Sequence, residues 1–203
     1  MATLLIFGAG GHGRVVADAA LASREWSGVS ACDRDPARSS GELLQGVTLQ
    51  PLTAALAAAS QVHVAIGNAA DREKEAGAVA AGLLTTVIHP RACVSSRALV
   101  GAGCFVAAQA VVAPGCSLGQ CVIVNHGAVV DHDVSVGDFS HVGPLAALGG
   151  GARVGRRTLV GSGACVLPGV RIGDDVVVGA GAVVRDHLEQ PGVYAGVPAR
   201  RMK

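Results

Sequence analysis

The chain has very few aromatic residues. Its 203 residues include one Trp, one Tyr and three Phe, so aromatic side chains make up only 2% of a sequence that is 50% hydrophobic. A core of the size that this length allows must therefore be filled by Val, Ala, Leu and Ile. Stacked ladders of aliphatic side chains meet that requirement without large rings.

The chain also has almost no excess of positive over negative charge. The formal net charge is +1, and the sequence has no long basic or acidic run, which argues against a nucleic-acid groove or an anionic membrane surface as partner. A basic leader and an apolar stretch of membrane length are missing after Met1 as well. We therefore expect a cytoplasmic protein that acts on a small, mostly neutral substrate.

The six cysteines include no CxxC pair, so no structural zinc site of the cysteine type is implied. Two of them, Cys104 and Cys116, fall on an inward position of the repeat described next, where a thiol packs like a small hydrophobic side chain. We expect a packing role for these cysteines.

What the chain has instead is an unbroken period of six. A period of six matches neither the 3.6 of a helix nor the 2 of a flat strand, so the backbone must turn once per hexad. This pattern is typical of the hexapeptide class of parallel β-helix. The aliphatic positions are Ile88, Val94, Val100, Val106, Val112, Leu118, Val124, Val130, Val136, Val142, Leu148, Val154, Val160, Val166, Ile172, Val178 and Val184.

Two further positions follow the same rhythm. Four residues after each aliphatic residue from Ile88 to Val178 comes a small or β-branched one, which fits a second inward position near a corner of a coiled prism. Glycine often stands directly after the aliphatic residue, as at Gly101, Gly119 and Gly161. We expect these glycines to supply the backbone freedom that a tight turn requires.

Residues 1–85 lack this rhythm and predict alternating strands and helices. The expected strands cover residues 3–7, 28–32, 62–66 and 84–87, and the expected helices cover residues 13–21, 52–59 and 71–81. The sequence thus predicts an α/β half-Rossmann domain over residues 1–85, followed by a β-helix domain over residues 86–203. A C-terminal tail, residues 190–203, leaves the repeat.

The α/β domain carries a glycine-rich turn. Gly8-Ala9-Gly10-Gly11-His12-Gly13 matches GxGxxG between an expected strand and helix, and Asp33 follows twenty residues after the last glycine. Backbone N–H groups at such a turn bind phosphate, to which His12 adds a hydrogen bond. Half of a dinucleotide fold suits a single nucleotide. We expect Asp33 or Asp35 to face its ribose or base.

A second group of candidates follows the third expected strand. Gly67 and Asn68 end that strand, and Arg72 lies one turn later. Ligands of open parallel sheets collect at the carboxyl ends of the strands, so these three residues are further candidates for nucleotide binding.

Histidines gather in one stretch of the repeat. His132 stands two residues after the aliphatic Val130 and Asp133 stands three after it, so both are expected in a turn and facing outward. His126 occupies the same slot one hexad earlier, and His141 precedes an aliphatic position. A histidine beside a carboxylate has its tautomer fixed and its basicity raised, which suits a general base.

Several segments together resemble the sialic acid O-acetyltransferase family, in particular its branch of nucleotide-sugar N-acetyltransferases that act on amino sugars. The resemblance spans nearly the whole chain. It includes the glycine turn, Val87-Ile88-His89-Pro90, the unbroken hexads, residues 125–133, Phe139-Ser140-His141-Val142 and Gly196-Val197-Pro198-Ala199-Arg200.

The resemblance implies a left-handed β-helix and a homotrimer with active sites between neighbouring subunits. It implies acetyl-CoA as co-substrate, no metal, and a role in bacterial surface-glycan biosynthesis. By position, His132 would be the general base and Asp133 its orienting acid, while Asn125 and His141 would belong to the substrate site. The nucleotide would be held by Gly8, Gly10, Gly11, His12 and Asp33.

The resemblance also assigns residues to acetyl-CoA. The N–H of Gly150 would bond to the thioester oxygen. The residues expected along the cofactor are His141, Gly150, Gly161, Gly179, Pro198 and Arg200.

Three alternatives stay open. A sugar O-acetyltransferase of the sialic acid type would use the same base and scaffold. A zinc hydro-lyase of the gamma carbonic anhydrase type could use His126, His132 and His141. The closely paired histidines of that family are missing, however, and the nucleotide-like first domain of this chain would have no role in such an enzyme. A non-catalytic sensor of nucleotide sugars would bind the nucleotide without turnover.

Overall fold

The computed structural model describes residues 2–202, which form two compact units that meet in sequence between Pro90 and Arg91. The first unit is a five-stranded sheet in the order β3-β4-β2-β1-β5, parallel except for the β3–β4 hairpin. The strands of this sheet are β1 (Thr3–Phe7), β2 (Gly28–Cys32), β3 (Glu42–Leu44), β4 (Val47–Leu49) and β5 (Gln61–Val64); β6 (Val87–Ile88), near the end of the unit, is not one of them. Its helices are α1 (Gly11–Ser23), α2 (Leu52–Ala58) and α3 (Ala69–Ala78), with a 3-10 turn at Pro36–Arg38.

Some details of this unit differ from the sequence-based expectation. The β3–β4 hairpin and the 3-10 turn were not expected, although Gly46 between the two hairpin strands has a positive φ of 84° and marks the turn. The strand expected at residues 84–87 is reduced to a single bridge from Leu84 to Val62 and to the two residues of β6. The helix expected from residue 71 begins at Ala69, because Asn68 caps it: the N–H of Asp71 donates to Asn68 Oδ1 over 3.0 Å.

The glycine-rich turn between β1 and α1 is a steric necessity at two of its positions. Gly8 has a φ of 120°, and a Cβ there would lie 2.7 Å from the carbonyl oxygen of Ala65. A Cβ at Gly13 would lie 1.9 Å from the Gly8 carbonyl oxygen, where helix α1 leaves the strand. By contrast, a Cβ at Gly10 would meet only Arg38 Nη1, at 3.7 Å, and one at Gly11 would meet nothing within 4 Å, so the N-terminus of α1 is accessible.

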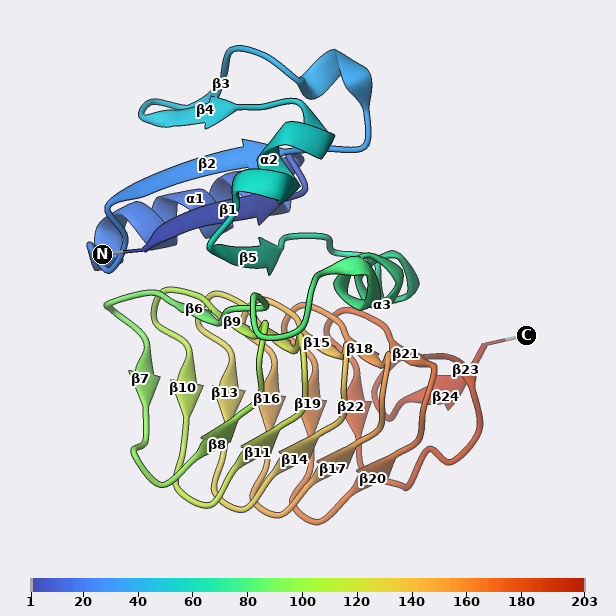
Figure 1. The fold of residues 1–203 in the computed structure, drawn as a ribbon. Coiled ribbons are helices and arrows are strands. Elements are labelled where there is room, and N and C mark those ends of the chain that lie inside the picture. Colours follow the sequence, from blue (N-terminus) through green and yellow to red (C-terminus); the bar gives the residue numbers. More distant parts are fainter. Residues whose placement is uncertain (1, 203) are drawn as a thin grey trace. The chain divides into compact units, whose positions relative to one another are not determined.

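The second unit is a parallel β-helix whose three sheets are drawn in Figure 1. Each strand pairs with the strand eighteen residues further along the chain, as Val112 does with Val130 and Val130 with Leu148, so three hexads complete one coil.

We number the three sheets of this helix. Sheet 1 contains β7 (Cys93–Val94), β10 (Val111–Val112), β13 (Val129–Val130), β16 (Ala147–Leu148), β19 (Cys165–Val166) and β22 (Val183–Val184). Sheet 2 contains β8 (Leu99–Val100), β11 (Ser117–Leu118), β14 (Ser135–Val136), β17 (Arg153–Val154) and β20 (Arg171–Ile172). Sheet 3 includes β9 (Phe105–Val106), β12 (Ile123–Val124), β15 (His141–Val142), β18 (Leu159–Val160), β21 (Val176–Val178), β23 (Gly192–Ala195) and the antiparallel β24 (Arg200–Arg201).

The aliphatic residues of the hexads form the core of this helix. From Val106 to Val184 every one of them is at most 4% exposed, as are the small residues that follow four positions later. Cys104 and Cys116 are buried among these small residues. Ile88, Val94 and Val100 are only half-buried, because they belong to the first coil, which has no coil below it.

The turns of the helix correct one expectation. The left-handed backbone does not occur at the glycines directly after the aliphatic residues but two positions later, as at Gly115, Gly127 and Asp133, with φ of 76°, 64° and 60°. The earlier glycines are required for another reason. A Cβ at Gly101 would lie 2.4 Å from the carbonyl oxygen of Gly119 on the next coil. They therefore allow close approach of stacked coils.

Within residues 2–202 no helix has both the length and the apolar character needed to cross a membrane.

Candidate active site

His132 and Asp133 lie in the outward turn between β13 and β14. Their side chains are 63% and 72% exposed, and His132 Nδ1 donates a hydrogen bond to Asp133 Oδ2 over 2.9 Å. Because this bond places the proton on Nδ1, the neutral ring keeps Nε2 free to accept another proton. The N–H of His132 in turn donates to Asp131 Oδ1 over 2.7 Å, which fixes the start of the turn.

The stacked coils on either side leave room for this pair only because they carry glycine. A Cβ at Gly115, one coil earlier, would lie 2.3 Å from Asp133 Oδ1. A Cβ at Gly150, one coil later, would lie 2.5 Å from His132 Nε2. Backbone hydrogen bonds join the same turns: Asp133 N–H donates to Pro114 O, and Gly151 N–H donates to His132 O. The imidazole and the carboxylate are therefore held between two glycine turns, which we call the His132 corner.

The electrostatic surroundings favour a basic imidazole. The hydrogen bond to Asp133 and, next, the negative charge of Asp131 raise the pKa of His132 above its ordinary value of 6.5. A raised pKa makes Nε2 a stronger proton acceptor in the neutral ring, which is the property that a general base requires.

A second cluster lies on another edge of the prism. Asn125 Nδ2 donates to His141 Nε2 over 3.0 Å, and Asn125 Oδ1 accepts the N–H of His126 over 2.8 Å, which orients the amide. This cluster, the Asn125 corner, lies where sheet 3 passes into sheet 1, whereas His132 lies where sheet 1 passes into sheet 2. Residues 128–131 separate the two corners, about 13 Å at about 3.3 Å per residue.

The residues expected along acetyl-CoA divide between the same two corners. Since one coil takes eighteen residues, Gly161 stands two coils above Asn125 and Gly179 three coils above it. Their N–H groups donate to Val178 O and Tyr194 O. Gly150 belongs to the His132 corner. Arg200 also approaches that corner, because its Nη1 donates to Asp186 Oδ2 over 3.2 Å, and Asp186 stands three coils above His132. Pro198 follows a cis peptide bond in the turn before β24.

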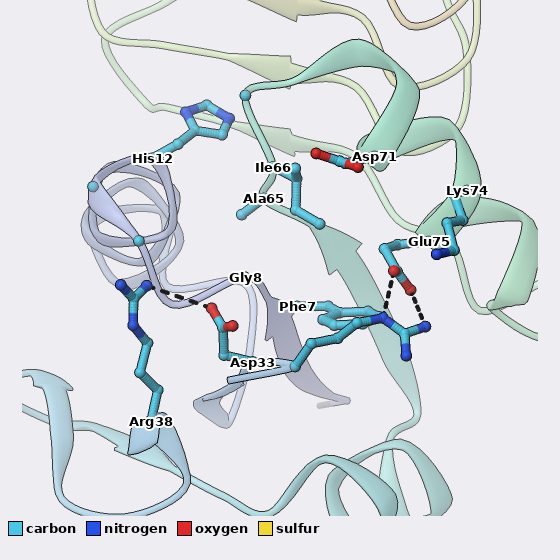
Figure 2. A pocket seen from close by; sticks show the side chains of 14 residues that line it. Phe7, Gly8, His12, Asp33, Arg38, Ala65, Ile66, Asp71, Lys74 and Glu75 are labelled. Atoms are coloured by element: carbon cyan, nitrogen blue, oxygen red, sulfur yellow. Dashed lines mark hydrogen bonds and ion pairs between the residues drawn. The ribbon is translucent and has the colours of Figure 1, made fainter. Parts of the chain in front are cut away.

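The first unit holds a cavity of about 440 Å³ at the carboxyl ends of its parallel strands. Gly8, Gly10, Gly11 and His12 line it around the N-terminus of α1, and Figure 2 labels Gly8 and His12 there. Asp33, at the end of β2, and Gly67, after β5, line it too. The glycine motif, His12 and Asp33 are thus brought together as the sequence indicated.

The two aspartates after β2 have different surroundings. Asp33 Oδ2 accepts the N–H of Ala9 over 2.7 Å, and Oδ1 accepts the N–H of Asp35, so this carboxylate braces the glycine turn. Arg38 Nη1 lies 3.6 Å from Asp33 Oδ2, as Figure 2 shows. Asp35 does not line the cavity; its carboxylate accepts the N–H of Ala37 and caps the 3-10 turn.

Two residues expected to contact the nucleotide instead hold the protein backbone. The side chain of Asn68 caps helix α3. Arg72 is 1% exposed, and its Nη1 donates to the carbonyl oxygens of Ile66 and Gly67 over 2.7 and 2.8 Å. Neither residue lines the cavity, so they shape the loop after β5 rather than the ligand surface.

Comparison with known proteins connects both units to one kind of enzyme. Residues 3–78 match the PglD N-terminal domain, and residues 151–186 match the bacterial transferase hexapeptide repeat. The acetyltransferase domain of PglB from Neisseria gonorrhoeae FA1090 is 36% identical, with complete coverage of both chains and a TM-score of 0.93. PerB from Caulobacter crescentus, solved with CoA and GDP-perosamine, is 37% identical over 100% of this chain and 98% of its own, with a TM-score of 0.91.

The chain belongs to the nucleotide-amino-sugar N-acetyltransferases. Its β-helix is accordingly the left-handed hexapeptide type, as the resemblance in sequence implied. The PglB domain has also been solved with acetyl coenzyme A, at 37% identity over 98% of both chains and a TM-score of 0.93.

Several residues that line the cavity of this acetyltransferase were not predicted from the sequence. The cavity is also lined by Arg34, Arg38, Asp71, Lys74 and Glu75, which come from the loop after β2 and from helix α3. The acidic and basic residues of α3 could have given a signal, since Asp71, Lys74 and Glu75 recur at helical spacing on one face. Nothing in the sequence indicated that this face would turn toward the glycine motif.

The three histidines considered as zinc ligands do not converge. His126 and His132 lie at different corners of the helix, and His141 lies on sheet 3. Across the part of the chain that the structure describes, no three His, Cys, Asp or Glu side chains gather closely enough to hold a metal ion.

Proposed function

We propose that this protein transfers the acetyl group of acetyl-CoA to the amino group of a nucleotide-linked amino sugar, with His132 as general base. The observation that carries the proposal is the hydrogen bond between His132 Nδ1 and Asp133 Oδ2, in a turn where Gly150 on the next coil leaves room for Nε2 and Gly115 on the preceding coil leaves room for the carboxylate. The cavity at the glycine motif receives the nucleotide. The reaction takes place in the cytoplasm, where acetyl-CoA is available, and serves surface-glycan biosynthesis.

The chemistry follows from the protonation state of His132. The sugar amine attacks the thioester carbonyl carbon while Nε2 takes a proton from the amine nitrogen. The N–H of Gly150, which is adjacent to the imidazole, stabilises the oxyanion of the tetrahedral intermediate. The carbon–sulfur bond then breaks, and the imidazolium returns its proton to the departing thiolate, so that free CoA is released and no covalent enzyme intermediate forms. The proton that Asp133 holds on Nδ1 keeps the ring in the reactive tautomer.

We also propose a homotrimer, and the apolar outward column of sheet 1 supports it. In register along the sheet stand Cys93, Val111, Val129, Ala147, Cys165 and Val183. The corresponding column of sheet 2 is Leu99, Ser117, Ser135, Arg153 and Arg171, which is mostly polar or charged. Leu145, at the Asn125 corner beside sheet 1, is 73% exposed. This apolar face suits burial against a second copy.

Threefold packing along sheet 1 also accounts for the division of the site residues. The His132 corner and the Asn125 corner are the two edges of this sheet. In a closed ring each protomer meets its neighbour through a heterologous interface, so one edge of a protomer faces the opposite edge of the next. His132 and Gly150 of one protomer then share a groove with Asn125, His141, Gly161 and Gly179 of the adjacent one.

The edge of the β-helix that runs through the His132 corner is long enough for an extended cofactor. Adjacent coils are about 4.8 Å apart, so Asp186 stands about 14 Å above His132. Arg185 and Arg200 both contact Asp186 and bring positive charge to this level. With the thioester at His132, the pantetheine arm runs along the glycine turns and the CoA phosphates reach these arginines. Arg200 and Pro198 keep the cofactor role expected of them.

The decisive experiment supplies acetyl-CoA with acceptors that differ in one group and follows the release of free thiol. Nucleoside diphosphate sugars that carry an amine should yield thiol and an N-acetylated product, whereas the matching sugars with a hydroxyl in place of the amine should not. Acetylation of the hydroxyl sugars with equal efficiency would instead identify an O-acetyltransferase. Tight nucleotide binding without thiol release from any acceptor would identify a sensor.

A further inference from the structure

The cavity of the first unit contains an ion pair that the reaction itself does not use. Arg34, just after β2, points to Glu75 on helix α3, and its Nε and Nη2 donate to the two carboxylate oxygens, the second over 2.5 Å. Figure 2 shows both dashed contacts at the edge of the cavity. A bidentate contact of this kind fixes the plane of the guanidinium as well as its position.

The two partners differ in exposure. The side chain of Glu75 is 5% exposed, whereas that of Arg34 is 57% exposed and lines the cavity. An ordinary surface ion pair has two mobile, solvated partners and contributes little to stability. Here a buried carboxylate holds an open guanidinium, so the arrangement orients Arg34 more than it stabilises the fold.

An aromatic ring covers one face of the same guanidinium. Arg34 Cζ lies over the ring of Phe7, 5.9 Å from its centroid, and Phe7 is 2% exposed at the end of β1. Phe7 is one of only five aromatic residues in the chain, and it lines the cavity. The guanidinium therefore has an aromatic ring on one side, a carboxylate at its edge and its remaining surface open to the cavity.

We propose that the open face of the Arg34 guanidinium is the surface on which the base of the nucleotide stacks, so that Phe7, Arg34 and the base form three layers. This inference rests on the proposed function, because it requires a nucleotide in the cavity. Guanidinium planes stack well on planar π systems, and all nucleobases offer such a face. Arg34 therefore contributes affinity for any base.

Base identity is then read at the edge of the ring rather than on its face. Asp71 and Lys74 of helix α3 line the same cavity and can offer an acceptor and a donor to that edge. This placement moves base recognition from Asp35, which caps the 3-10 turn, to Arg34 and the face of helix α3. The glycine turn and Arg38 are left for the phosphates.

The test uses the full-length protein and three nucleotide probes, UDP, GDP and dTDP, with inorganic pyrophosphate as the probe without a base. Calorimetric titration first identifies the nucleotide that binds most tightly. Arg34→Lys keeps the charge but removes the plane, so it should weaken binding of that nucleotide about tenfold, the size of one lost base stack. Its affinity for pyrophosphate should change less than about twofold. Arg24→Lys, at the other end of α1, is the matched control and should bind as the unmodified protein does.

Glu75→Gln tests whether the ion pair acts by orienting Arg34. Alone, it should weaken nucleotide binding several-fold, because the guanidinium loses its fixed plane. In the double variant with Arg34→Lys it should add almost nothing, since there is no plane left to fix. In turnover assays with acetyl-CoA and the nucleotide-linked amino sugar as acceptor, each variant should raise the KM of the acceptor with little change in kcat, while thermal melting checks that the fold is intact.

The outcomes separate this inference from the proposed function. Equal nucleotide affinity of Arg34→Lys and the unmodified protein would overturn the stacking role while leaving acetyl transfer intact. An equal loss of pyrophosphate binding would overturn it too, because Arg34 would then contact phosphate. If none of the three nucleotides bound and no nucleotide-linked amino sugar were acetylated by the unmodified protein, the proposed function would fail instead.

Discussion

The β-helix and the α/β unit present their functional side chains in different ways. In the β-helix each turn repeats the backbone of the turn before. The outward direction of His132 therefore follows from its place in the sequence, two residues after Val130. In the α/β unit the cavity residues come from separate elements, and only their packing brings Arg34 near Glu75. A periodic scaffold therefore fixes direction in the sequence itself, whereas an aperiodic one fixes it only after folding.

The strongest way to break this comparison is to disturb the repeat. Val130 is fully buried, so Val130→Asp places an unpaired carboxylate in the aliphatic column and should lower the melting temperature by more than about 10 °C, or prevent folding. Ser117→Asp, on an outward position of sheet 2, should change it by no more than roughly 2 °C. Similar melting curves for the two variants would show that the hexad does not define the core.

The second test changes Val129, the outward neighbour of Val130. Val129→Arg places a charge on the apolar face of sheet 1 and should convert the proposed trimer to monomers, with turnover reduced more than about a hundredfold, because the proposed site is shared between protomers. Light scattering and the thiol assay measure the two effects. Ser117→Arg is the matched variant on sheet 2. A monomeric unmodified protein with full activity would contradict the shared site.

The third test concerns the glycines around His132 and Asp133, the proposed catalytic pair. Gly150→Ala and Gly115→Ala each add one methyl group, which must displace the His132 imidazole or the Asp133 carboxylate. We expect kcat/KM to fall about tenfold to a hundredfold, as misplacement of a catalytic group by about 1 Å can cause. Gly77→Ala, where nothing lies within 4 Å, should leave it unchanged. Unaltered kinetics in Gly150→Ala would show that the imidazole works from another position.

The smallest expected effect is a displacement of the pH profile. His132 must be neutral to accept a proton, so kcat/KM should rise with pH through the pKa of this group. Asp133 raises that pKa above 6.5, and the rise should therefore lie above pH 6.5 in the unmodified enzyme. In Asp133→Asn it should move to lower pH, together with a lower plateau. A rise at the same pH in both proteins would mean that Asp133 does not act on the titrating group.

The sequence predicted the β-helix almost residue by residue because its core requires only a repeated pattern. The role of the glycines after the aliphatic residues was misjudged, since a close approach between coils is a property of two coils and cannot be seen in one hexad. In the α/β unit the motif predicted a glycine turn between a strand and a helix, and Gly8 and Gly13 leave no room for a Cβ in that turn. Asn68 and Arg72 were taken for ligand contacts, because a helix cap and a buried backbone donor use the same side chains as a binding site.

Replacement of His132 tests the central claim most directly. His132→Ala should lower kcat by about 10²–10⁴-fold with saturating acetyl-CoA and amino sugar, while its melting temperature stays that of the unmodified protein. Gln120→Ala, which changes the same turn position at a corner outside the proposed groove, should keep full activity. A loss of less than about threefold in His132→Ala would contradict the assignment of the general base.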